Sequence, residues 1–194
     1  DQPRSRGLGD VYKRQDVIFV ARLGQLALAA SSLAVAIVAL LAMGLNGVTG
    51  AVAPLIAAEI GRRHNSVREV RRSTRMALWI AVLIGAACVG LCFFGGAFMR
   101  LTGQAPEVVA LSGHFIRVIA IAIVPMAVAN VLRTFVSALG RPFFATAITA
   151  LSILVNVLGN YTLVFGHFGL PALGLTGSAL SSILTACMTV IAYA

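Results

Sequence analysis

Long stretches without a charged side chain dominate this sequence and define its predicted elements. Residues 27–57 and 76–99 contain no charged residue, which gives apolar runs of 31 and 24 residues. A helix rises about 1.5 Å per residue, so each run can cross the ~30 Å hydrocarbon core of a bilayer. Two further uncharged runs, residues 143–166 and 171–194, follow the turn Gly140-Arg-Pro142. The pattern predicts four membrane-spanning helices.

A fifth span is marked less clearly, between the second and third of these runs. Its apolar part covers residues 118–132 and is preceded by His114 and Arg117. We place this span at roughly residues 115–139. Pro125 should kink it, because proline removes a backbone donor from the helix interior. For the same reason we expect Pro54 to kink the far end of the first run.

Composition agrees with this pattern. The chain is 59% hydrophobic and only 11% charged, whereas soluble domains carry roughly 25% charged residues. The three cysteines all lie inside apolar runs, and no Cys/His spacing suggests a metal site. We therefore predict an all-α polytopic membrane protein without a metal site.

Arginine positions predict the orientation of the spans. Residues 61–75 hold six arginines, and the helical spacing within this run predicts a short amphipathic helix on the membrane surface. Eight arginines fall on this side of the predicted bundle and three on the other. By the positive-inside rule, the loop at residues 62–75 is cytoplasmic. We also expect the chain to lie in a plasma membrane, which in a bacterium is the inner membrane. The net charge of +9 therefore does not indicate nucleic-acid binding.

A few polar side chains inside the spans are the candidate site residues. Asn156 and Asn160 lie four residues apart, on the same face of a helix. Unpaired amides are costly in hydrocarbon, so this face meets either a partner helix or a wet cavity. Asp16 is the only carboxylate within an apparent membrane helix. Further possible cavity-lining residues are Asn130, Tyr161 and Ser178.

Four stretches of the sequence carry a family resemblance. They are residues 16–30, 54–61, 132–142 and 156–179, of which the last is the most specific. Together they resemble the multidrug and toxic compound extrusion (MATE) family. Val17 and the Ala21-Arg22 pair depart from the polar and glycine positions usual after the family's aspartate.

The resemblance implies a transporter with two six-helix lobes. Residues 16–194 would form a MATE-like N-terminal lobe: the end of helix 1, helices 2–5 and most of helix 6. The C-terminal lobe of the same full-length protein would be its partner. We expect residues 1–15, which hold the only lysine, to be non-native or disordered.

The resemblance also implies an activity and a site. The protein would export cationic or amphipathic small molecules in exchange for H⁺ or Na⁺, without a cofactor. Asp16 would bind the coupling ion, and Asn156 and Asn160 would hydrogen-bond Asp16, a water or the cation. A carboxylate in a partly dry cavity can take up a proton readily, because desolvation disfavours its charged form.

Other functions remain open at this point. A lipid-linked oligosaccharide flippase of the same superfamily would need more charged residues in its cavity than these spans contain. A membrane scaffold would not need an acid and two amides inside its spans. An intramembrane serine protease built on Ser178 would need a histidine within reach, and none follows this serine. We therefore expect a transporter rather than an enzyme.

Overall fold

The computed structural model describes seven helices and no strand over residues 20, 24–50, 54, 58, 67–101, 103, 105–166 and 171–193. The helices are α2 (Gln25–Gly50), α4 (Val67–Phe93), α5 (Gly95–Leu101), α6 (Pro106–Ala120), α7 (Ile123–Ala138), α8 (Pro142–Phe165) and α9 (Gly174–Tyr193). Among them α2, α4, α8 and α9 are long and apolar enough to cross a membrane, and the bent pair of α6 and α7 is together long and apolar enough for a fifth span. The predicted all-α polytopic membrane fold is confirmed. Most residues around the predicted kink at Pro54 lie outside the described residues, and so do all of residues 1–15.

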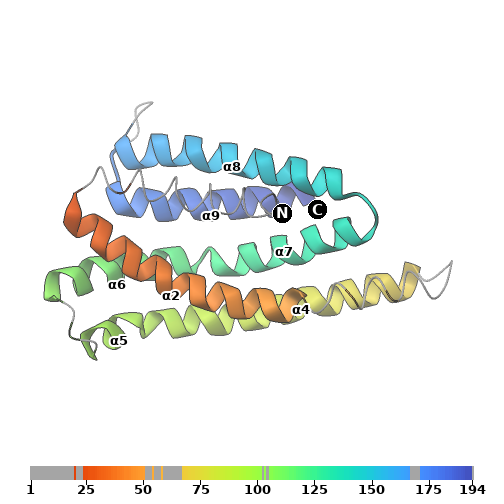
Figure 1. Cartoon of the computed structure of the whole chain (residues 1–194), viewed down its shortest axis with the longest axis horizontal. Coiled ribbons are helices and arrows are strands. Elements are labelled where there is room, and N and C mark those ends of the chain that lie inside the picture. The colour runs from red at the N-terminus through yellow and green to blue at the C-terminus, as the bar shows by residue number, and fades with distance from the viewer. Residues whose placement is uncertain are drawn as a thin grey trace, which may run out of the picture.

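The helices lie side by side along the long axis of the molecule (Figure 1). The adjacent helices α8 and α9 share the largest interface, and α7 contacts α2, α4, α8 and α9. The start of α4 and the turn between α7 and α8 lie at one end of the bundle (Figure 1). The end of α8, the start of α9, α5 and the start of α6 lie at the other end. The arginines at the start of α4 and in the α7–α8 turn therefore gather at a single end.

The packing core of this bundle consists mainly of small side chains. Ala30, Ala34, Ala81 and Ala179 are completely buried. Many large apolar side chains point outward instead, as three exposed examples on α2, α4 and α8 illustrate: Met43, Leu83 and Phe143. Membrane bundles show this pattern, because small residues let helix backbones approach while lipid covers the large apolar groups.

The bend between α6 and α7 follows from Pro125. The two helices meet at 41° across residues 121 and 122. Pro125 cannot donate to the carbonyl of Ile121, and the amides of residues 121 and 122 instead bond three residues back, to Val118 and Ile119. The predicted kink is confirmed, but the predicted start of this span at residue 115 is wrong, since α6 begins at Pro106.

The arginine-rich segment differs from its prediction. Helix α4 runs without interruption from Val67 to Phe93, so no separate surface helix precedes the second span within the described residues. Arg71, Arg72 and Arg75 are exposed on its first turns. A helix that extends beyond the bilayer keeps its backbone hydrogen bonds while arginine side chains reach water, so the chain has no need to break here.

The turns around α8 are those that the sequence indicates. Gly140 precedes Pro142 with a φ of 76°, and Gly166 ends the helix in the left-handed conformation with a φ of 74°. These angles favour glycine, which has no Cβ to clash. At the other end of the hairpin, Tyr193 Oη of α9 donates to the Ala145 carbonyl at 3.1 Å. Both ends of the α8–α9 hairpin are thereby held in place.

Candidate functional site

Asn156 and Asn160 form a buried amide pair on α8. Both side chains have no exposed surface. Asn160 Nδ2 donates to Asn156 Oδ1 at 3.0 Å, across one turn of the helix. The helical spacing predicted from the sequence therefore produces a direct contact between the two amides.

A close helix–helix contact surrounds this pair. The Ser181 hydroxyl of α9 donates to the Asn156 backbone carbonyl at 3.0 Å. Gly159 lies between the two asparagines in sequence, and a Cβ at this position would overlap the Ser181 Oγ. On α9, a Cβ at Gly177 would overlap the backbone of Leu163. The two glycines let α8 and α9 approach closely, which excludes bulk water from the amide pair.

One donor of the pair has no acceptor. Among the described residues, no group accepts a hydrogen bond from Asn156 Nδ2, although the atom is fully buried. An unsatisfied buried donor costs about 1–3 kcal/mol, so such an atom is well suited to bind an oxygen ligand. A carboxylate, a water or a carbonyl of a substrate could accept this bond. Asp16, the predicted coupling residue, lies outside the described residues.

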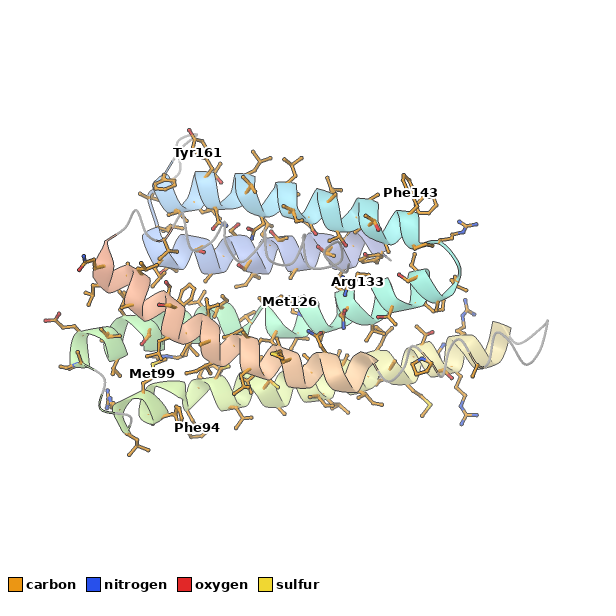
Figure 2. All side chains as sticks on the ribbon, in the orientation of Figure 1. Phe94, Met99, Met126, Arg133, Phe143 and Tyr161 are labelled. Carbon is orange, nitrogen blue, oxygen red and sulfur yellow. The ribbon has the colours of Figure 1, made fainter. Side chains whose placement is uncertain are left out.

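The other predicted lining residues take different positions. Ser178 is buried on α9, in the first turns of the helix that packs on α8. Tyr161 is exposed and points away from the bundle (Figure 2). Its ring packs edge-to-face on the Phe165 ring, with 6.5 Å between the ring centroids. Ser178 thus shares the α8–α9 region with the amide pair, whereas Tyr161 faces the outer surface of the described bundle.

Asn130 belongs to a second polar group, between α2 and α7. Its Nδ2 donates to Asn46 Oδ1 at 3.0 Å, and its Oδ1 accepts from the Arg133 guanidinium at 3.0 Å. The Arg133 side chain is exposed on α7 (Figure 2). Arg133 lies in helix α7, inside the predicted fifth span and more than a turn before the end at Ala138. This second group joins α2 to α7, whereas the amide pair lies on α8.

The role of Asn46 was missed by the sequence reasoning. Asn46 is the only side-chain amide in its apolar run and lies between Gly44 and Gly47. A single amide in such a run could have indicated a polar contact with another helix. Its partner Asn130 lies 84 residues further along the chain. Pattern alone could not pair two amides on separate spans, because either one could have faced any neighbouring helix.

Comparison with known proteins identifies the family. The sequence profile of the MatE family matches residues 10–162. A probable multidrug resistance protein NorM from Mesorhizobium japonicum is 37% identical over 174 residues, which is 89% of this chain and 37% of that protein. A second probable NorM, from Brucella suis, is 34% identical over 89% of this chain and 37% of its own length.

A solved structure shows the same fold. A MOP superfamily transporter from Pyrococcus furiosus superposes with a TM-score of 0.80 at 22% identity, over 96% of this chain and 40% of that one. The chain thus spans less than half the length of the proteins it matches. The family profile covers most of the chain, and the relatives and the fold agree with it. This multi-pass membrane protein therefore belongs to the MatE family, the MATE family that its sequence motifs resemble.

Proposed function

We propose that this chain forms one lobe of a secondary antiporter in a bacterial inner membrane, which exports cationic or amphipathic small molecules in exchange for H⁺ or Na⁺. The observation that carries the proposal is the buried Asn156–Asn160 pair with its unsatisfied donor at Asn156 Nδ2. An unsatisfied buried donor destabilises a pair that serves packing alone, so its presence supports a binding role for Asn156. The family membership and the name of the relatives, multidrug resistance protein, support export of several compounds.

The amide pair suits a site that binds and releases a small cation. Asn156 Nδ2 can donate to a carboxylate and thereby stabilise its charged form. When that carboxylate takes up a proton or a sodium ion, it becomes a weaker acceptor and the hydrogen bond weakens. The buried position of the pair strengthens this dependence, because electrostatic interactions are less screened away from water.

Asp16 is the carboxylate that we assign to this role. It is the only acidic residue in an apparent membrane helix, and by its family resemblance it matches the coupling aspartate. Substrate and coupling ion would compete for the region around Asp16 and the amide pair. That competition would link export of the substrate to entry of the coupling ion.

The test is drug efflux by the full-length protein in membrane vesicles, with an imposed proton or sodium gradient. Asp16→Asn should abolish gradient-driven efflux while the protein still reaches the membrane in normal amounts. Glu107→Gln is the matched control, because Glu107 is an exposed carboxylate in the first turn of α6. Wild-type efflux by Asp16→Asn would disprove the assignment. Comparison of the two gradients identifies the coupling ion.

A further inference from the structure

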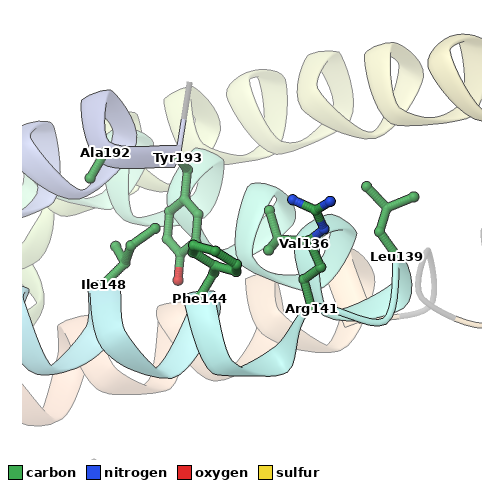
Figure 3. A pocket seen from close by; sticks show the side chains of 7 residues that line it. All are labelled: Val136, Leu139, Arg141, Phe144, Ile148, Ala192 and Tyr193. Atoms are coloured by element: carbon green, nitrogen blue, oxygen red, sulfur yellow. The ribbon is translucent and has the colours of Figure 1, made fainter.

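A cleft opens where the end of α7, the start of α8 and the end of α9 meet (Figure 3). Its volume is about 540 Å³. Phe144, Ile148 and Tyr193 contribute to its largely apolar wall, and Arg141 is the only charged residue among the described residues of the lining. Sites for small molecules commonly measure about 300–1,000 Å³, so the cleft can accept part of an amphiphile.

The mouth of the cleft lies at the level of the membrane surface. Helix α8 begins at Pro142, directly after Arg141. Phe143 and Phe144 are largely exposed in the first turn of this helix, and Phe144 lines the cleft together with Tyr193 of α9. Aromatic side chains gather at the interface between hydrocarbon and headgroups. The guanidinium of Arg141 is therefore at the height of lipid phosphates.

Arg141 carries a charge that the described residues do not neutralise. Glu107 is the only acidic residue whose side chain is described, and it lies at the opposite end of the bundle. The Arg141 guanidinium is placed over the Phe144 ring, 5.8 Å from its centroid. A cation–π contact orients the group without using its N–H donors, which are left available for phosphate oxygens.

The surrounding charge favours an anionic ligand. Arg71, Arg72 and Arg75 at the start of α4 lie at the same end of the bundle as Arg141. Basic groups attract anionic lipids at the cytoplasmic leaflet, and basic pockets between membrane helices on that side bind their headgroups.

We propose that this cleft binds an anionic phospholipid, with its phosphate on Arg141 and the first part of an acyl chain against Phe144, Ile148 and Tyr193. The two chemical halves of the lipid match the two parts of the cleft, a cationic mouth and an apolar wall. Since three helices form the wall, a bound lipid would contact α7, α8 and α9 together and stabilise their packing. This site is independent of the amide pair and of the proposed antiport.

The experiment is native mass spectrometry of the purified full-length protein with phosphatidylglycerol or phosphatidylethanolamine of identical acyl chains. Wild-type protein should bind phosphatidylglycerol in preference. Arg141→Gln should weaken phosphatidylglycerol binding about fivefold and leave phosphatidylethanolamine binding unchanged. Ile148→Trp should weaken phosphatidylglycerol binding by filling the apolar wall. Arg141→Lys, which keeps the positive charge, should retain most of the preference.

Arg100→Gln is the control, because Arg100 is an exposed arginine in the last turn of α5 at the opposite end. The proposal is overturned if Arg100→Gln and Arg141→Gln have equal effects, or if wild-type protein binds both lipids equally. It is also overturned if Ile148→Trp binds phosphatidylglycerol normally, or if millimolar inorganic phosphate displaces the lipid. Circular dichroism of each variant identifies any that has unfolded, and the remaining variants then decide.

Discussion

Gly159 of α8 lies so close to Ser181 of α9 that a Cβ on the glycine would overlap the serine Oγ. The serine hydroxyl occupies the space left by the missing side chain and donates to the Asn156 carbonyl. The same contact that joins the two helices thus positions the backbone beneath the amide pair. Both the close packing of α8 on α9 and the position of the Asn156–Asn160 pair therefore depend on Gly159.

The two glycines of the α8–α9 contact should differ in their sensitivity to alanine. Gly177→Ala places a methyl group against the Leu163 backbone, which cannot move aside, so we expect a loss of about 1–3 kcal/mol in the free energy of unfolding. Gly159→Ala meets a serine hydroxyl that can rotate, so its cost should be smaller. Thermal unfolding in detergent measures both changes.

Gly90→Ala is the control for this series. Gly90 lies exposed on α4, and a Cβ added there would have no other atom within 4 Å. Alanine should therefore be neutral at this position or stabilise the helix by about 0.5–1 kcal/mol. If Gly177→Ala unfolds at the same temperature as Gly90→Ala, the close approach of α8 and α9 is not required for stability.

Asn156→Leu separates a transport role from a packing role. Leucine has the same branching and the same number of side-chain heavy atoms as asparagine and removes the amide, and hydrogen bonds between membrane helices contribute only about 0.6 kcal/mol on average. We therefore expect near-normal thermal stability together with loss of gradient-driven efflux. Thr146→Leu, at an exposed position on the same helix, should leave efflux intact. Normal efflux by Asn156→Leu would leave the pair as a structural contact.

The Asn46–Asn130 hydrogen bond should couple α2 to α7 energetically. In a double-mutant cycle with Asn46→Ala and Asn130→Ala, we expect an interaction energy of about 0.6 kcal/mol and at most about 1.7 kcal/mol. The free energy of unfolding of the four proteins gives this value. Additive effects of the two substitutions would show that the 3.0 Å contact contributes nothing to stability.

The arginine-rich end of the bundle should face the cytoplasm. Arg72→Cys on α4 and Arg100→Cys on α5 put thiols at opposite ends, in a background with Cys88, Cys92 and Cys187 replaced by alanine. A membrane-impermeant maleimide should label Arg100→Cys in intact spheroplasts. It should label Arg72→Cys only after permeabilisation, and the reverse pattern would contradict the positive-inside assignment.

The spans themselves could be predicted from the sequence. Uncharged runs located α2, α4, α8 and α9, because transfer of a long apolar segment into a bilayer depends on composition and length rather than on neighbours. Gly140, Pro142 and Gly166 marked the turns for a similar reason, since their backbone preferences are local. The start of α6 was missed because Glu107, His114 and Arg117 interrupt its apolar pattern while leaving its backbone hydrogen bonds intact.

The sequence by itself determined the class of the protein, its family and the spacing that puts Asn156 beside Asn160. Only the tertiary structure decided which faces meet: Ser181 on the Asn156 carbonyl, Asn46 on Asn130, and Arg141 at the mouth of a cleft formed by three helices. The physical reason is that hydrophobicity and helical period act along the chain. The pairing of helices depends on the fit of small residues and the satisfaction of polar groups across separate spans, which no single segment contains.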